Sequence, residues 1–202
     1  MLTAPIWLHQ KTGSIIDRSH IGVKVGAITK LQTITTTTIE TTTKTRFEEI
    51  RVNMAEMKAE KNPVKLVTSV GSCVAICLYD SANMCGGLAH IMLPKSAIAP
   101  HESLPGKFAD TAVPSLANEV RKLCRKESRL SAKIAGGANM FPNMNALNIG
   151  AKNVEAVKEA LAQHKIRLIA EDVGGSHGRR ISFEVETGNV TVKVFNGETI
   201  EL

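Results

Sequence analysis

Cys73 and His90 are the two residues of this sequence whose types and settings best fit nucleophilic chemistry. Cys73 follows Gly71-Ser72 at a turn between two apolar segments, where a side chain can lie at the rim of a sheet beside backbone N–H groups that bind an oxyanion. A cysteine nucleophile needs a base that takes its proton, and His90 lies in a later apolar segment. If a hairpin joins these two strands, the thiol and the imidazole come side by side.

A third group must orient the imidazole of such a pair, and two hydroxyl residues are candidates. Thr68 and Ser69 both lie on the segment that leads into the turn. The same residues also permit a purely structural interpretation, because a histidine in an apolar strand is often a satisfied core residue and a cysteine there often only packs. Spacing alone leaves both interpretations open.

The remaining cysteines raise the questions of disulfides and of a metal site. Cys77 and Cys124 are predicted to fill the core, whereas Cys85 beside Gly86-Gly87 is left unassigned. No secretory signal is visible, and in a reducing compartment disulfides are not expected. A metal site is a weaker alternative, because no pair of its ligands has the spacing of a structural zinc site. Its ligands would be Cys73, Cys77, His90 and His177.

The elements that must position these residues are those of an α+β fold. From position 47 onward, short apolar runs between turn residues predict a single domain of mixed β-sheets packed with two main helices. The first helix is capped by Asp110, or begins nearer Pro114, and ends about residue 126; the second runs from Asn148 or Gly150 to about residue 164. The predicted strands are 50–54, 64–70, 74–79, 87–93, 133–135, 166–173, 181–185 and 190–195.

The composition is that of an ordinary globular chain with an unusual beginning. The 202 residues are 43% hydrophobic and 22% charged, which excludes a wholly disordered or fibrous protein. Residues 33–45 form a low-complexity run in which nine of thirteen are Thr. This run lacks the apolar alternation of a buried strand, so residues 1–46 are predicted to be a disordered extension and residues 47–202 the functional domain.

The net charge of +6 is not gathered into one basic surface, so a nucleic-acid partner is not expected. One local basic cluster near the end of the first helix either complements the helix dipole as a solvated face or docks an acidic protein. No apolar stretch is long enough for a membrane helix, so a cytoplasmic protein that is not membrane-embedded is expected. The basic cluster consists of Arg121, Lys122, Arg125, Lys126 and Arg129.

Five segments resemble the signature of the CheD family, the chemoreceptor glutamine deamidases of bacterial and archaeal chemotaxis. They occur in the family's order and cover most of the predicted domain, which makes the set far more specific than any one motif. The Thr-rich beginning has no counterpart in this resemblance. The five segments are TSVGSCVAICLYD (68–80), GLAHIMLP (87–94), AKIAGGANMF (132–141), NIGAKN (148–153) and EDVGGSHGRR (171–180).

The resemblance implies a hydrolase, a protein-glutamine glutaminase with a cysteine-hydrolase-like fold that acts on methyl-accepting chemoreceptors. It places the nucleophile on Cys73, the catalytic histidine on His90 and the orienting threonine on Thr68. Because the spacing of that threonine varies, Ser69 is its substitute.

The implied reaction needs neither a metal nor an organic cofactor. Backbone N–H groups at Gly71 and Ser72 are the oxyanion-binding candidates. The resemblance also implies a CheC-like phosphatase as a binding partner. An alternative function is therefore a docking or regulatory module for that phosphatase, with catalysis secondary.

Overall fold

The computed structural model describes residues 48–61, 63–98, 104–124, 128–140 and 148–202. The predicted extension 1–46 therefore lies outside the described residues. No helix in these ranges is long and apolar enough to span a bilayer. The helices are α1 (Ala109–Leu123), α2 (Ile149–Gln163) and the short 3₁₀ helix η1 (Ser96–Ile98). The strands are β1 (Glu48–Arg51), β2 (Met57–Lys61), β3 (Val64–Val70), β4 (Val74–Asp80), β5 (Cys85–Ile91), β6 (Ser131–Gly136), β7 (Arg167–Val173), β8 (Arg179–Glu184), β9 (Val190–Val194) and β10 (Thr199–Glu201).

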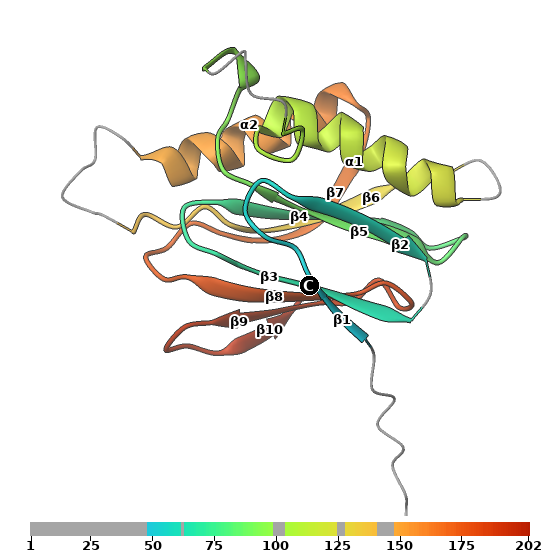
Figure 1. Ribbon diagram of the computed structural model, residues 1–202. Helices are drawn as coiled ribbons and strands as arrows, with labels where there is room; N and C mark the ends of the chain where they lie inside the picture. The colour runs from blue at the N-terminus through green and yellow to red at the C-terminus, as the bar shows by residue number, and fades with distance from the viewer. Residues whose placement is uncertain (1–47, 62, 99–103, 125–127, 141–147) are drawn as a thin grey trace, which may run out of the picture. The chain divides into compact units, whose positions relative to one another are not determined.

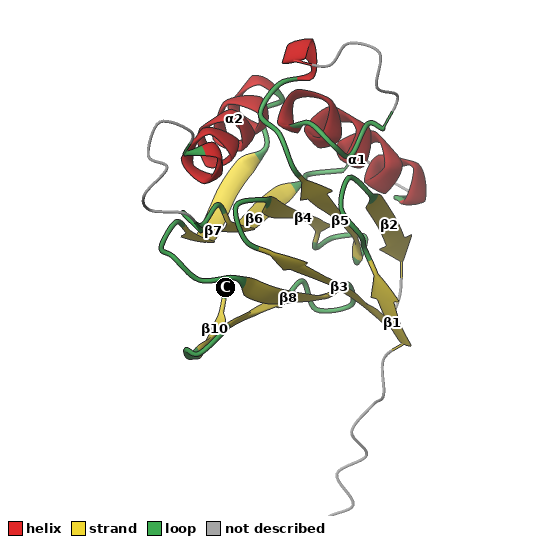
Figure 2. Ribbon diagram, turned by 60° about the vertical axis from the view of Figure 1, so that its left-hand side comes forward, coloured by secondary structure: helices red, strands yellow, loops and turns green. Residues whose placement is uncertain are grey.

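The strands form two five-stranded sheets, one of which is covered by the helices. Sheet A has the order β1-β3-β8-β9-β10, and sheet B has the order β2-β5-β4-β6-β7. Each sheet is mixed, because β1 runs parallel to β3 and β6 parallel to β7, whereas the other pairs are antiparallel. Helices α1 and α2 lie on one face of sheet B, and sheet A lies on its other face (Figure 1, Figure 2). The predicted α+β fold is confirmed, while its likeness to cysteine hydrolases stays a prediction.

Strand β4 lies in the middle of sheet B and is buried on both faces. Val74, Ile76 and Leu78 belong to the core beneath the helices. Ala75 and Cys77 belong to the core between the two sheets, so Cys77 packs as predicted. A strand buried on both faces is a continuous apolar run, which is why the sequence alone identifies this one.

The two helices begin differently from one another. Asp110 is not the cap of α1 but lies in its first turn, and Pro114 lies inside the helix. The Asp110 carboxylate accepts hydrogen bonds from the Ser96 N–H at 3.0 Å and from the Ser96 hydroxyl at 2.9 Å. The predicted Asp110 cap and the alternative start near Pro114 are therefore wrong. Helix α2 starts as predicted, with Asn148 Oδ1 accepting the Ala151 N–H at 3.2 Å.

The prediction from sequence misses β2 and β10, which are edge strands of sheets B and A. Strand β10 is exposed throughout, and β2 carries three charged residues among its five. Edge strands bury little surface and so show little apolar alternation. For the same reason the predicted strand 50–54 is displaced, since β1 ends at Arg51 before the chain crosses to sheet B.

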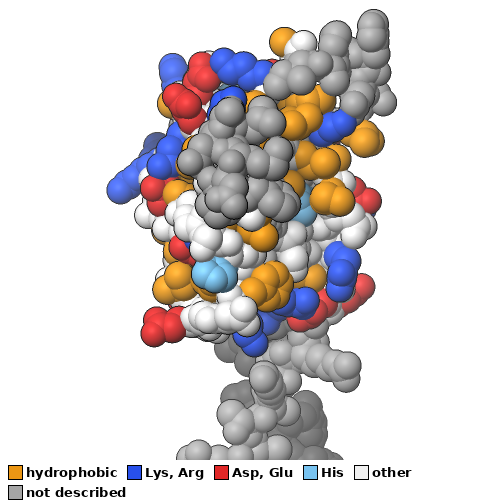
Figure 3. All heavy atoms as spheres, turned by 90° about the vertical axis from the view of Figure 1, so that its left-hand side faces the viewer, with side chains coloured by type: hydrophobic (Ala, Val, Ile, Leu, Met, Phe, Trp, Pro, Cys, Tyr) orange, Lys and Arg blue, Asp and Glu red, His pale blue; other side chains and the backbone are white. Residues whose placement is uncertain are grey.

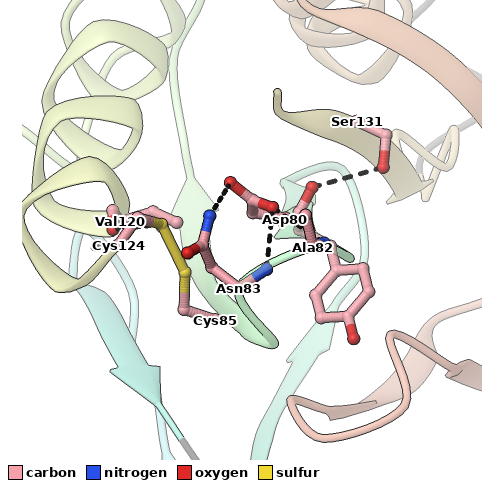
Figure 4. The surroundings of a disulfide bond; sticks show 8 residues. Asp80, Ala82, Asn83, Cys85, Val120, Cys124 and Ser131 are labelled. Atoms are coloured by element: carbon pink, nitrogen blue, oxygen red, sulfur yellow. Dashed lines mark hydrogen bonds between the residues drawn. A yellow bond between two sulfur atoms is a disulfide. The ribbon is translucent and has the colours of Figure 1, made fainter. Parts of the chain in front are cut away.

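A disulfide joins Cys85, at the start of β5, to Cys124, the residue after α1 (Figure 4). It ties the end of the helix to sheet B across a sequence separation of 39. The turn before Cys85 is held by Asp80, whose carboxylate accepts the N–H groups of Ala82 at 3.0 Å and Asn83 at 3.1 Å (Figure 4). The expectation that no disulfide forms is wrong, because sequence spacing does not reveal which cysteines the packing of a helix on a sheet brings together.

Candidate active site

Cys73 and His90 come from one hairpin of sheet B. Strands β4 and β5 are antiparallel, and Ala75 pairs with His90. Cys73 directly precedes β4, and because side chains alternate it points to the same side as Ala75, diagonally across from His90. Cys73 packs against the core between the two sheets. The hairpin expected to bring the thiol and the imidazole onto one face is therefore present.

Thr68, on the neighbouring strand of sheet A, contacts the imidazole from the other side. Its Oγ1 lies 2.8 Å from His90 Nδ1 and also donates to the Val52 carbonyl at 2.8 Å. A hydroxyl has a single proton, and the Val52 carbonyl can only accept it. Thr68 Oγ1 must therefore accept the Nδ1–H of His90, which leaves the lone pair of the imidazole on Nε2. Ser69 is exposed on the opposite face of β3 and makes no such contact.

Burial disfavours the charged forms of the Cys73 thiol and the His90 imidazole. It raises the pKa of Cys73 above its usual 9.0 and lowers the pKa of His90 below its usual 6.5. His90 is 4% exposed, and its Nε2 has no hydrogen-bond partner among the described residues. Catalytic hydrogen bonds are often long in unliganded enzymes and tighten with substrate. Both shifts disfavour a preformed thiolate–imidazolium pair.

Two backbone N–H groups that follow β6 hold the turn that carries Cys73. Gly137 N–H donates to the Cys73 carbonyl and Ala138 N–H to the Gly71 carbonyl, each at 2.8 Å. Gly136 has a φ of 118°, and a Cβ at this position would collide with the Cys73 carbonyl oxygen. The Gly-Gly-Ala segment, predicted only as a tight turn, supports the turn that carries Cys73.

Helix α2 holds the same turn through a buried amide. Asn153 is 0% exposed, and its Nδ2 donates to the Ser72 carbonyl at 3.0 Å and to the Met92 carbonyl at 2.9 Å. The carbonyls of Gly71, Ser72 and Cys73 therefore all have donors. In the part of the chain that the structure describes, the N–H groups of these three residues have no acceptor. N–H groups in this state can stabilise an oxyanion.

Asn153 and Arg179 are two residues near the turn whose roles are not predicted from the sequence. Asn153 lies on the inner face of α2, one turn before the fully buried Val157, and a polar residue at such a position is the signal that could have found it. Arg179 pairs with Asp172, Nε to Oδ2 at 2.6 Å, and donates to the Gly174 carbonyl at 2.9 Å. Arg179 thereby orders the glycine-rich loop between β7 and β8.

A pocket of about 210 Å³ opens beside His90 and Thr68. Cys73 does not line it, so the pocket lies next to His90 and not over the thiol. Arg51 and Arg180 both line it, and Arg180 pairs with Glu49 at 3.2 Å. The lining residues are Arg51, Val52, Asn53, Met54, Val67, Thr68, Ser69, His90 and Arg180.

Large apolar side chains are exposed near the turn. Met140 is 41% exposed and lies so close to Gly71 that a Cβ there would be 3.2 Å from its side chain. Phe195 is 50% exposed and lies against Gly178. Figure 3 views this end of the molecule and shows hydrophobic side chains at the surface among polar and basic ones. Exposed apolar side chains of this size favour contact with another protein segment over a small polar molecule.

The alternative metal site is not assembled in the described ranges. The potential metal ligands that lie close together there are Asp80, Cys85 and Cys124, and the two cysteines form the disulfide. His177 is exposed, and its Nδ1 lies 3.2 Å from the Ser176 hydroxyl. The structure does not bring together the set Cys73, Cys77, His90 and His177.

Known proteins match most of the described part of the chain. A family model described as CheD chemotactic sensory transduction matches residues 92–194. The chemoreceptor glutamine deamidase CheD of Thermotoga maritima is 46% identical over 153 residues, which cover 75% of this chain and 96% of that protein. The probable chemoreceptor glutamine deamidase CheD of Methanococcus vannielii is 46% identical over 148 residues, covering 73% of this chain and 96% of the relative.

Proposed function

Because this chain belongs to the CheD family, we propose that it is a hydrolase that converts glutamine side chains of methyl-accepting chemoreceptors to glutamate and releases ammonia. The observation that carries the proposal is the contact of Thr68 Oγ1 with His90 Nδ1 at 2.8 Å. It leaves Nε2 of a buried, neutral imidazole as the base on the face that Cys73 shares. The relatives' names supply the substrate class, and the geometry supplies a means of acting on it.

The proposed reaction begins when His90 Nε2 takes the Cys73 proton as the sulfur attacks the carboxamide carbon of a receptor glutamine. The carbonyl oxygen becomes an oxyanion that the N–H groups of Gly71, Ser72 and Cys73 can stabilise. His90 then gives its proton to the departing nitrogen, which leaves as ammonia, and a thioester forms on Cys73. Water, deprotonated by His90, hydrolyses the thioester to glutamate and restores the thiol. Each step uses groups of this chain, the substrate and water.

The proposed site faces a protein substrate. Met140 and Phe195 are large, apolar and exposed near the Cys73 turn. Such side chains favour a receptor segment as the occupant, because they would bury apolar surface against it.

We also propose that the protein is located in the cytoplasm.

A CheC-like phosphatase is the second proposed partner, and docking of it is the alternative function. The exposed Arg121 and Lys122 at the end of α1 are candidate contacts for an acidic partner surface, although Lys122 already pairs with Glu119 at 2.6 Å. Arg125 and Lys126 of the basic cluster lie outside the described residues. If docking and catalysis are separate, Cys73→Ala binds the phosphatase with unchanged affinity in a titration. A large loss of affinity in that variant would show that docking depends on the catalytic turn.

The enzymatic proposal is tested by incubating receptors with the wild-type protein and with Cys73→Ala. We expect peptide mass spectrometry to find glutamate in place of glutamine, together with released ammonia, only with the wild type. Equal conversion by Cys73→Ala would overturn the assignment of the nucleophile. The absence of conversion by either protein would favour the docking function.

A further inference from the structure

The amide of Asn153 bridges the two chain segments that carry the reacting side chains. One of its acceptors is the carbonyl of Ser72, the residue before Cys73, at 3.0 Å. The other is the carbonyl of Met92, just beyond the end of the strand that carries His90, at 2.9 Å. Because both neighbours are carbonyl oxygens, only the NH₂ end of the amide can face them, which fixes the orientation of the side chain.

The hydrogen bond to Ser72 also sets the direction of the next N–H group. The chain contains no cis peptide bond in its described part, so the carbonyl of Ser72 and the N–H of Cys73 point in opposite directions from one planar unit. Asn153 draws this carbonyl toward α2, and the N–H of Cys73 must therefore point away from the helix. That N–H has no acceptor among the described residues, as an oxyanion donor requires.

The start of α2 is fitted closely against the support of the turn. A Cβ at Gly150 would lie 2.5 Å from the Gly137 carbonyl oxygen and 2.7 Å from that of Ala138. This close approach lets the short side chain of Asn153 reach the turn while remaining 0% exposed. If the side chain at this position only filled the core, an apolar residue would pack there without the free-energy cost of desolvating an amide.

We propose that Asn153 is a positioning residue of the active site, which aims the N–H of Cys73 at the oxyanion and fixes the nucleophile turn relative to the His90 strand. The inference rests on the proposed function for its physiological reaction. Its chemistry also applies to any acyl transfer to Cys73, so it has a test of its own.

The test compares Asn153→Leu, which keeps similar bulk but removes both donors, with the wild type. Acylation of Cys73 by p-nitrophenyl acetate forms an oxyanion, whereas alkylation by iodoacetamide does not. We expect the ratio of the acylation rate to the alkylation rate to fall by roughly tenfold or more, and kcat for receptor deamidation to fall about 10²-fold with little change in KM. Rates are measured on the folded fraction isolated by gel filtration, because unfolded molecules also expose Cys73 and Cys77 to both reagents.

Val157→Ala is the matched control, because Val157 is buried on the same helix face but contacts the helix-side core and not the turn. It destabilises the domain and should leave the ratio unchanged. If Asn153→Leu does not fold, Asn153→Ala is assayed in the same way. A ratio within twofold of the wild type, or an equal fall in Val157→Ala, would overturn the inference. Failure of the proposed function instead shows as receptor conversion that is absent or insensitive to Cys73→Ala, and the ratio still decides the role of Asn153.

Discussion

At the scale of single residues, one hydroxyl group determines which ring nitrogen of His90 carries the proton. Thr68 donates its proton to the Val52 carbonyl and accepts the Nδ1–H of His90, so the lone pair of the imidazole is left on Nε2. An imidazole held in the other tautomer could not take the thiol proton from the side on which Cys73 lies.

Thr68→Val keeps the shape of the side chain but removes the hydroxyl that accepts the Nδ1–H of His90. We expect kcat for deamidation to fall by about 10²-fold, because the correct tautomer of His90 is no longer selected. Thr68→Ser retains the hydroxyl and should recover most of the rate in the same steady-state assay. A strong loss in Ser69→Ala with none in Thr68→Val would reverse the assignment.

The expected pH dependence of activity and of cysteine alkylation follows from the directions in which the pKa values of His90 and Cys73 are shifted. The pKa of His90 is lowered, so the imidazole stays neutral and active below its usual 6.5, and the acid limb of kcat/KM should lie below that value. The pKa of Cys73 is raised, so alkylation of its thiol by iodoacetamide should keep rising through pH 9.0, its usual pKa. A plateau of alkylation across the neutral range would instead indicate a preformed thiolate–imidazolium pair.

At the scale of the elements, the apolar run of β4 and the turn before it could be predicted from the sequence. The contacts from other elements that hold this turn and orient His90 could not. The bounds of β3 match the prediction, yet its apolar pattern does not say whether Thr68 or Ser69 faces sheet B, because that depends on how two sheets stack. The contact of Asn153 with Ser72 joins residues far apart in sequence, and no local periodicity encodes it.

Gly136→Ala tests the support of the turn. Gly136 and Gly174 both have positive φ, 118° and 80°, so alanine is strained at either position, by about 1–3 kcal/mol. Only at Gly136 would the added Cβ also collide with the Cys73 carbonyl, whereas nothing lies within 4 Å of a Cβ at Gly174. We expect Gly136→Ala to lose kcat at least about 10²-fold and Gly174→Ala to lose only stability in urea unfolding. Equal kcat values would contradict the proposed support.

The disulfide between Cys85 and Cys124 ties α1 to sheet B and does not involve Cys73, which is a free cysteine. The disulfide closes a loop between residues with a sequence separation of 39, which restricts the unfolded chain. The double variant Cys85→Ser/Cys124→Ser should therefore lower the free energy of unfolding by about 2–4 kcal/mol and leave kcat unchanged. Urea unfolding with and without a reductant measures the difference. The reductant should not change the free energy of unfolding of the double variant. If it also leaves that of the wild type unchanged, the disulfide does not contribute to stability.

At the scale of the whole molecule, we propose that residues 47–202 are the catalytic domain. The T. maritima relative is matched over 96% of its length by 153 residues of this chain, which supports a catalytic unit smaller than the full 202 residues. A truncated protein that begins at residue 47 should have the kcat of the full chain. A truncated protein that folds but loses most of its rate would show that the Thr-rich segment takes part.

The proposed role of Cys73 as nucleophile is tested most directly by following this residue during turnover. Wild type and Cys73→Ala are mixed with receptors in ¹⁸O-labelled water, quenched with acid and analysed by peptide mass spectrometry. We expect a receptor γ-glutamyl group joined to Cys73 as a thioester at early times, followed by glutamate that carries one ¹⁸O, and neither product with Cys73→Ala. Labelled glutamate formed at the same rate by Cys73→Ala would contradict the proposed role of Cys73.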